Sequence, residues 1–198
     1  MRHVIAAVVA GAIVFAVNFA SWMFLPYHGQ SLHELPGGEK IAADLKAAGA
    51  ANAVYHWPSM PQGKNNQPPT KEEMEAFEKQ YGAGPAVSLL VFRPQLGKLM
   101  SPEIMGANLA ANVGAGFILA LVLAAAARGG VGYFGRVLMS LGFGLFAALQ
   151  GPLPEALWWG QPPEYFLVTV ADLAVGWFAA GVVVAMFYPA RELIVART

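Results

Sequence analysis

The sequence contains no cysteine and few charged residues. The absence of cysteine excludes disulfide frameworks, thiolate metal sites and cysteine nucleophiles. Charged residues make up 12% of the 198 residues and hydrophobic residues 57%, whereas soluble domains carry about 25% charged residues. Twelve Lys and Arg balance twelve Asp and Glu, which excludes a strongly basic nucleic-acid binder and a strongly acidic disordered tail. This composition indicates a membrane protein.

Motifs that name a reaction are also missing from the sequence. It has no Gly-x-Ser-x-Gly elbow, no His-Glu-x-x-His, no phosphate loop and no dinucleotide fingerprint, and each of these is the usual mark of an enzyme or cofactor site. We therefore expect no catalytic residue and no cofactor other than a metal ion, and the sequence favours a non-enzymatic role over an enzymatic one.

Four stretches are long and apolar enough to cross a membrane, since about 20 apolar residues cross about 30 Å of hydrocarbon. Arg136 and several glycines make the third stretch the weakest, although glycine is common in membrane helices. The first stretch has 22 residues, which is longer than the apolar part of a signal peptide, so we expect a retained anchor. The predicted spans are Val4–Leu25, Ile104–Ala127, Val131–Gln150 and Phe166–Tyr188.

The predicted fold class is all-α membrane: a four-transmembrane-helix bundle with a small α+β extracytoplasmic domain between the first two helices. The predicted division of the chain is 1–26 (first transmembrane helix), 27–102 (periplasmic α+β cap), 103–128 (second transmembrane helix), 131–151 (third), 152–165 (outer interfacial loop), 166–188 (fourth) and 189–198 (cytoplasmic tail).

Orientation follows from the cations, because short loops rich in Lys and Arg stay in the cytoplasm. Arginines flank the inner ends of all four spans, whereas the short loop 151–165 has no Lys or Arg. We therefore expect both termini inside and the long segment outside, in a bacterial inner membrane. Aromatic rings favour membrane interfaces, and the predicted outer anchors are Trp22, Trp158, Trp159 and Tyr165.

The long outer segment contains signals for two helices and two strands. Thr70 followed by Glu73 predicts a capping box at the start of a helix, and Gly82 is its predicted stop. The predicted order is a helix over Glu39–Ala48, a strand over Ala53–Trp57, the capped helix, and a well-buried strand over Ala86–Phe92. Ser101 and Pro102 are the predicted N-cap and first turn of the second span.

Polar residues within the spans are the main candidates for function. Asp172 is the only ionisable residue well inside the apolar part of a span, and such residues are functional candidates by default. It lies about 10 Å below the outer boundary at 1.5 Å per residue. We expect it to share an interior layer with asparagines of the first and second spans, beside small residues that allow close helix approach. The predicted layer comprises Asp172, Asn18, Asn108 and Asn112.

Two interpretations of this layer stay open. In the first, Asp172 donates to or accepts from the amides and joins the helices, each bond contributing about 0.6–2 kcal/mol. In the second, Asp172 is the titrating ligand of a proton or cation site that opens outward, and the amides supply neutral oxygen atoms.

Histidines form a second constellation. His28 and His33 lie just above the membrane, and His56 lies in the cap. With Met60 or Glu34 nearby, the three imidazoles are able to hold copper or zinc. Their spacing matches no standard ligand motif, so surface or hydrogen-bonding histidines are the alternative.

Several short motifs occur along the chain: Trp158-Trp159, Pro163 and Tyr165 followed by Asp172 and Gly176-Trp177, with the earlier Leu25-Pro26-Tyr27-His28 and Tyr55-His56-Trp57-Pro58. Together they resemble a family of uncharacterised four-span bacterial inner-membrane proteins. The resemblance implies the four-span topology with a periplasmic domain. It implies no catalytic residue.

The function predicted from these features is that of an accessory or scaffolding subunit of a larger membrane complex. Its predicted partners are the lipid bilayer and other membrane-protein subunits, with no nucleic acid. A small oligomeric transporter or channel using the Asp172 layer is the alternative, and a periplasmic histidine metal site is the weaker one.

Overall fold

The computed structural model describes residues 1–63 and 67–189. The predicted cytoplasmic tail 189–198 lies outside this range except for Pro189. The described chain forms two units. The helical unit comprises Met1–His33 and the chain from Lys98 onward, and the insert unit comprises Glu34–Gly97.

Within the described residues, four helices are long and apolar enough to cross a membrane, as predicted. The start of the second of these helices has its predicted signals. Ser101 Oγ accepts from the backbone N–H of Ile104 at 3.3 Å, and Pro102 occupies the first turn. The four helices are α1 (Arg2–Phe24), α5 (Pro102–Arg128), α6 (Tyr133–Gln150) and α8 (Pro163–Val184).

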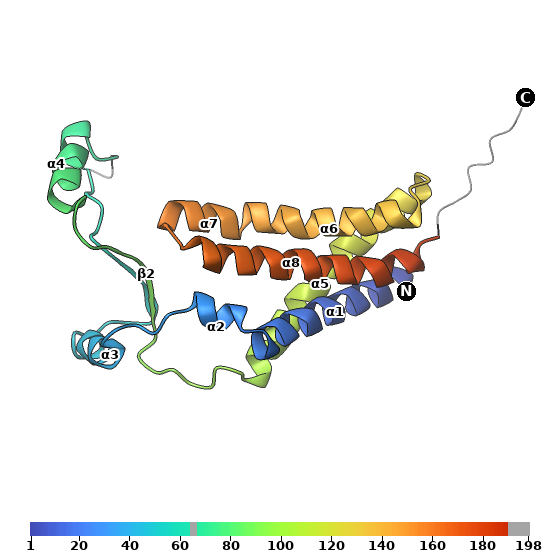
Figure 1. The fold of residues 1–198 in the computed structure, drawn as a ribbon, viewed down its shortest axis with the longest axis horizontal. Helices are drawn as coiled ribbons and strands as arrows, with labels where there is room; N and C mark the ends of the chain where they lie inside the picture. Colours follow the sequence, from blue (N-terminus) through green and yellow to red (C-terminus); the bar gives the residue numbers. More distant parts are fainter. Residues whose placement is uncertain (64–66, 190–198) are drawn as a thin grey trace, which may run out of the picture. The chain divides into compact units, whose positions relative to one another are not determined.

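Three short helices accompany the long ones in the helical unit. The helix α2 (Tyr27–Ser31) follows α1 directly and packs against α8. The helix α7 (Pro152–Trp159) follows α6 (Figure 1), as the prolines and tryptophans of this loop suggest. A single 3-10 turn, η2 (Ala185–Phe187), extends α8.

The spatial order of the long helices differs from their order in the chain. The helix α1 packs against both α5 and α8, and α8 also packs against α6. The helices α5 and α6 are joined by the short turn 129–132 and make little further contact. The result is the series α5–α1–α8–α6, with α1 and α8 at its centre.

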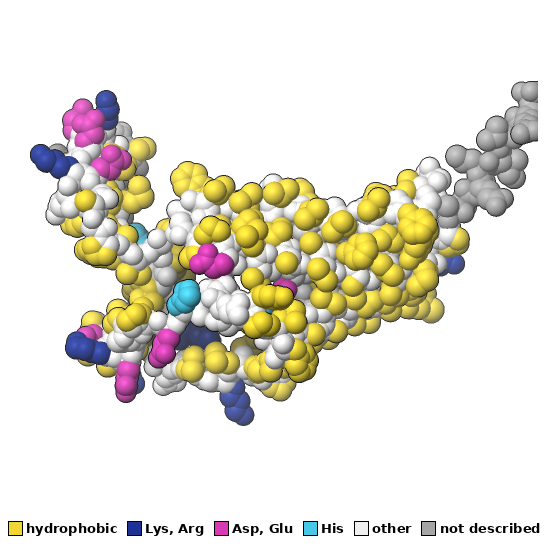
Figure 2. Space-filling view, viewed as in Figure 1, with side chains coloured by type: hydrophobic (Ala, Val, Ile, Leu, Met, Phe, Trp, Pro, Cys, Tyr) yellow, Lys and Arg dark blue, Asp and Glu magenta, His cyan; other side chains and the backbone are white. Residues whose placement is uncertain are grey.

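Close packing is concentrated toward one end of the long helices, so each helix is divided along its length into two parts. The closed half comprises α1 up to Val14, α5 from Val113, α6 up to Gly144 and α8 from Leu173, and it contains the hydrophobic core built around Leu119, Leu123 and Val184. The other half, the open half, has no buried residue in α5 before Gly116 or in α8 before Gly176. Figure 2 shows that the surface of the helical unit is predominantly hydrophobic.

Glycines set the tight helix crossings of the closed half. A Cβ on Gly11 of α1 would lie 2.6 Å from the backbone nitrogen of Val113, and one on Gly144 of α6 would lie 2.5 Å from the carbonyl oxygen of Leu173. Helices approach most closely where no side chain intervenes. Substitution at these positions therefore forces the backbones apart.

Polar side chains join the ends of α6 and α8 in the closed half. The buried guanidinium of Arg136 donates to the carbonyl oxygen of Ala185 at 3.3 Å and to that of Val131. The Tyr133 hydroxyl donates to the carbonyl oxygen of Val182 at 2.8 Å. A cation near a helix C-terminus interacts favourably with the carbonyl groups of the last turn. Arg136, which weakens the third span in the sequence, thus links it to α8.

The insert unit has the predicted order of elements. They are α3 (Gly38–Ala47), β1 (Ala53–Trp57), α4 (Lys71–Tyr81) and β2 (Val87–Phe92). The capping box is present: Thr70 N–H donates to Glu73 Oε2 at 2.9 Å, and Glu73 N–H donates to Thr70 Oγ1 at 3.2 Å. The strands pair antiparallel, with Ala53 opposite Phe92 and Tyr55 opposite Leu90.

The prediction that the second strand is well buried is wrong. Phe92 is buried, whereas Val87, Leu89 and Val91 are exposed. A continuous apolar run predicts a strand covered on both faces, but β1 and β2 form a two-stranded ribbon. Neither α3 nor α4 contributes a buried residue.

Candidate functional site

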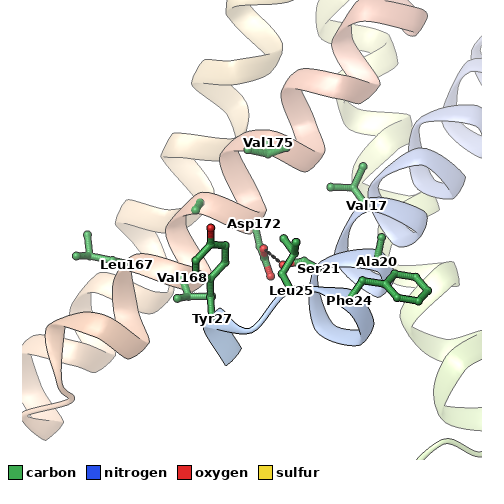
Figure 3. A pocket seen from close by; sticks show the side chains of 11 residues that line it. Val17, Ala20, Ser21, Phe24, Leu25, Tyr27, Leu167, Val168, Asp172 and Val175 are labelled. Carbon is green, nitrogen blue, oxygen red and sulfur yellow. Dashed lines mark hydrogen bonds between the residues drawn. The ribbon is translucent and has the colours of Figure 1, made fainter. Parts of the chain in front are cut away.

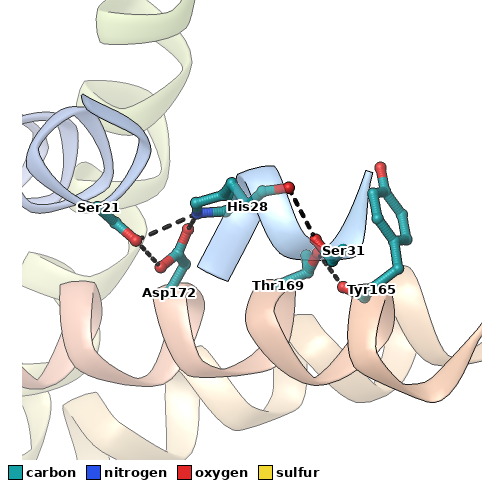
Figure 4. Close-up of polar contacts among 6 residues, drawn as sticks. All are labelled: Ser21, His28, Ser31, Tyr165, Thr169 and Asp172. Atoms are coloured by element: carbon teal, nitrogen blue, oxygen red, sulfur yellow. Dashed lines mark hydrogen bonds and ion pairs between the residues drawn. The ribbon is translucent and has the colours of Figure 1, made fainter. Parts of the chain in front are cut away.

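The site around Asp172 is built by the turn that follows α1. The helix ends at Phe24, Leu25 is extended, and Pro26 starts α2. Proline lacks a backbone N–H and cannot continue a helix, so the chain turns here. The short helix α2 then lies against α8 and directs His28 at Asp172 (Figure 4).

Ser21, His28 and Asp172, together the Asp172 cluster, contact one another directly. Ser21 Oγ donates to Asp172 Oδ1 at 2.7 Å. His28 Nε2 lies 3.0 Å from Asp172 Oδ2 and 3.2 Å from Ser21 Oγ. The side chains of His28 and Asp172 are only 8% and 16% exposed. A carboxylate in an apolar region needs such partners, and here both of its oxygens have one.

Further contacts hold the histidine ring in place. The Trp22 ring stacks on it, with centroids 3.8 Å apart and an interplanar angle of 15°. Ser31 Oγ donates to the carbonyl oxygen of His28 at 3.1 Å. The Asp172 cluster therefore joins three segments, α1, α2 and α8, through buried polar contacts.

Serine, histidine and aspartate also form hydrolytic triads, but this geometry differs from a triad. In a triad the carboxylate and the serine bond opposite nitrogens of the imidazole. Here both approach Nε2 of His28, and the Ser21 hydroxyl donates its hydrogen bond to Asp172 Oδ1. The arrangement fixes the positions of its members and does not activate Ser21 as a nucleophile.

A cavity of about 640 Å³ lies beside the Asp172 cluster, between α1 and α8 (Figure 3). Asp172 and Ser21 border it, and most of its lining is apolar, including Val17, Phe24 and Val168. The carboxylate is thus at the edge of an apolar space in the open half.

The predicted polar layer divides into two groups. Asn18 and Asn108 line a second cavity, of about 590 Å³, between α1 and the start of α5. Asn112 Nδ2 donates to Asn108 Oδ1 at 3.0 Å. Asp172 bonds to Ser21 and His28 and not to these amides. Asn18 Oδ1 is buried and has no hydrogen-bond partner within the described part of the chain.

The asparagines of the second span are less buried than expected for an interior layer: Asn108 is exposed and Asn112 is half-buried. The small residues expected beside them, Gly106, Ala110 and Gly114, lie on the opposite side of α5 and are exposed as well. Asp172 differs, because Gly176 and Ala180 on its stripe are buried, as predicted. The small residues of α5 that pack against α1 lie one to two turns further along the helix.

The described residues include no metal-binding group of histidines and carboxylates. No group of three or more His, Cys, Asp or Glu suited to a metal ion occurs within residues 1–63 and 67–189. His28 is engaged with Asp172 and Ser21, and His33 and His56 are exposed. Glu34 and His56 belong to the insert unit, whereas His28 and His33 belong to the helical unit.

The predicted interfacial aromatic residues all lie in the open half of the helical unit or in the short helix α7 beside it. Trp22 is 53% exposed near the end of α1, and Trp158 is 86% exposed in α7. Trp159 is exposed and Tyr165 is half-buried. Trp22 has a second role, because its ring covers His28.

Sequence reasoning missed Ser21 as a partner of Asp172. The available signal was a serine one turn beyond Asn18 and seven residues before a histidine, with Pro26 between them to turn the chain back.

Comparisons with family models, curated proteins and solved structures found no match to this chain. The resemblance to a four-span bacterial family therefore stays a prediction.

Proposed function

We propose that this chain is an integral membrane protein that acts as an accessory or scaffolding subunit of a larger membrane complex. It would lie in a bacterial inner membrane with both termini cytoplasmic and residues 27–102 periplasmic. The four apolar helices and the arginines at their closed end support this placement. The observation that carries the scaffolding role is the incompletely bonded amide pair of α5, Asn108 and Asn112.

The two amides lie deep within an apolar helix, and Asn108 borders the second cavity beside α1. Asn112 is ten residues beyond Pro102, which places it about 15 Å along the helix, near the middle of a hydrocarbon layer about 30 Å thick. The single bond between Asn108 and Asn112 leaves Asn108 Nδ2 and Asn112 Oδ1 free to bond elsewhere. An amide without partners in an apolar medium costs about 2–7 kcal/mol.

Small residues on the opposite side of α5 leave room for a second neighbour, because positions two residues apart lie about 200° apart around a helix. A Cβ added to Gly106 or Gly114 would meet no atom within 4 Å, whereas one on Gly116 would lie 2.7 Å from the carbonyl oxygen of Ala7. One small-residue face of α5 is thus covered by α1, and a second is uncovered. The stretch from Gly106 to Gly114 has the spacing that permits close helix contact.

The partner that fits the amide pair is a membrane-spanning helix of another subunit that carries at least one amide or hydroxyl group to bond the free halves of Asn108 and Asn112. The apolar part of a lipid has no such group, so lipid leaves the amides without partners.

The test is the composition of the complex after mild detergent extraction. Native mass analysis of the wild type is expected to give unlike subunits in fixed stoichiometry. The variant Asn108→Leu/Asn112→Leu should lose the partner while its monomer stays folded, because neither side chain is buried. The matched control Asn108→Gln/Asn112→Gln keeps the amides and should retain at least part of the complex. A wild type recovered only as a bare monomer contradicts the proposal, and so does a leucine variant that keeps its partner.

Contacts of Asp172 weigh against the transporter alternative. A transport path through the predicted layer requires the carboxylate and the amides to share one space. Asp172 is bonded on both oxygens, and the asparagines line a different cavity. Its role in the proposed subunit is to fix α1 and α2 on α8, so that α5 is presented by a stable support.

A further inference from the structure

Two arginines at the closed end of the helical unit line one cavity. Arg2 begins α1 and Arg128 ends α5, and both border a space of about 410 Å³, here named the arginine cavity. Its other lining residues are Met1, His3, Ala124, Ala127, Tyr188 and Pro189. It is separate from the Asp172 cluster, which lies in the open half.

The charge of the arginine cavity has one sign. Its lining holds two guanidinium groups and no carboxylate among the described residues. The helix α1 starts here, so its first N–H groups add partial positive charge. On the wall, His3 Nδ1 lies 2.9 Å from the Tyr188 hydroxyl, and the two rings stack with centroids 5.4 Å apart. This stacking holds two further polar groups at the cavity edge.

The arginine cavity also has an apolar wall. Ala124 and Ala127 on α5 are each 4% exposed and belong to the hydrophobic core. The guanidinium group matches the oxygens of a phosphate in a bidentate way. A phosphate attached to an apolar chain therefore fits both the charged and the apolar parts of this cavity.

We propose that the arginine cavity binds the phosphate group of an anionic membrane lipid. Arg2 and Arg128 hold the phosphate oxygens, and the wall of Ala124 and Ala127 contacts the start of the lipid's apolar part. Basic pockets between membrane helices at the cytoplasmic side bind anionic headgroups in this manner. The inference rests on the membrane placement proposed above, because only that placement brings lipid headgroups to this end of α1 and α5.

The test uses the full-length protein in a neutral detergent. It is titrated with short-chain phosphatidylglycerol, short-chain phosphatidylcholine and inorganic phosphate, and binding is followed by native mass analysis and by the thermal unfolding midpoint. The variant is Arg2→Gln/Arg128→Gln. The control Lys71→Gln/Arg93→Gln removes two positive charges from the insert unit instead.

We expect the wild type to bind phosphatidylglycerol at least about tenfold more tightly than phosphatidylcholine. Loss of two charge-assisted contacts should weaken that binding at least about tenfold in the arginine variant, and the control should match the wild type. Equal binding by the two variants overturns the proposal. Inorganic phosphate that binds as tightly as the lipid also overturns it, in favour of a site for free phosphate.

Two further measurements keep these outcomes distinct. The unfolding midpoint of the variant without lipid checks its fold, and Arg128→Gln alone replaces the double variant if that midpoint is lost. Fractionation with membranes is measured separately from lipid binding in detergent. A protein that fails to fractionate contradicts the placement, whereas one that fractionates without selective lipid binding contradicts only the cavity.

Discussion

The closed and open halves of the helical unit contain parts of the same four helices but are held together by different interactions. In the closed half, alanines, glycines and a few large aliphatic residues bring α1, α5 and α8 into close contact, and Leu119, Leu123 and Val184 are fully buried. In the open half the helices are held by the polar contacts of Asp172, and two cavities lie beside α1. Shape complementarity provides stability in one half, and the other half keeps polar groups accessible.

This difference teaches that small residues alone do not identify a packed face. Gly116 and Gly144 lie against a neighbouring backbone, whereas Gly106, Gly114 and Gly142 meet no atom within 4 Å of an added Cβ. The three predictions below test the comparison by adding a large side chain, removing the Asp172 carboxyl group and removing one hydroxyl group.

The largest effect is expected from adding a large side chain in the closed half. Gly144→Leu should destabilise the helical unit by about 3 kcal/mol or more, because its Cβ would lie 2.5 Å from a backbone oxygen. Gly142→Leu, two residues earlier on the same helix, should change stability by no more than about 0.5 kcal/mol. Thermal and denaturant unfolding in detergent measure both. Equal effects of the two variants would show that α6 and α8 are not in close contact.

An intermediate effect is expected from the open half. Asp172→Ala leaves Ser21 and His28 without their carboxylate partner, which should cost about 1–3 kcal/mol. The matched control is Asp44→Ala, because the Lys40–Asp44 pair is exposed and should contribute less than about 1 kcal/mol.

Unfolding in denaturant, monitored for the helical unit, gives both values. The native chain has no cysteine, so the double variant Ser21→Cys/Asp172→Cys offers a second readout. It should form a cross-link between α1 and α8 on oxidation. A failure to cross-link in a folded protein would refute the contact itself.

The smallest effect is expected from a single hydroxyl group that joins α6 to α8. Tyr133→Phe removes the hydrogen bond to the carbonyl oxygen of Val182 and should cost about 0.5–1.5 kcal/mol. Tyr27→Phe serves as control, because the Tyr27 side chain is 55% exposed. Calorimetry or denaturant midpoints resolve a difference of this size. A larger loss in Tyr27→Phe would reverse the assignment.

The sequence predicted local structure well because its signals are local. The capping box at Thr70, the proline after Ser101 and the length of the apolar runs depend on neighbouring residues, and each appears in the structure. The depth of Asp172 and Asn18 follows from the same counting. Burial of β2 was mispredicted because it depends on what covers the strand.

The candidate site was predicted only in part. Asp172 was identified from its position in a span, but its partners depend on how α1, α2 and α8 are arranged around it. His28 was considered as a metal ligand because it lies near His33 in the chain, whereas its contact is with a residue 144 positions away. The exposure of Asn108 depends on α5 packing against α1 only from about Gly116 onward, and no periodicity in α5 alone shows where along the helix that contact begins.

The central place of α1 has a consequence for biogenesis. The long helices form two consecutive pairs, α1 with α5 and α6 with α8, and the pairs meet through α1 and α8. Each pair is complete once its second helix has been synthesised, so the pairs can insert one after the other and dock afterwards. A chain break in the turn 129–132 would leave both pairs whole. Two co-expressed fragments divided there should reassemble. The contact between α1 and α8, which joins the two pairs, would be the last to form.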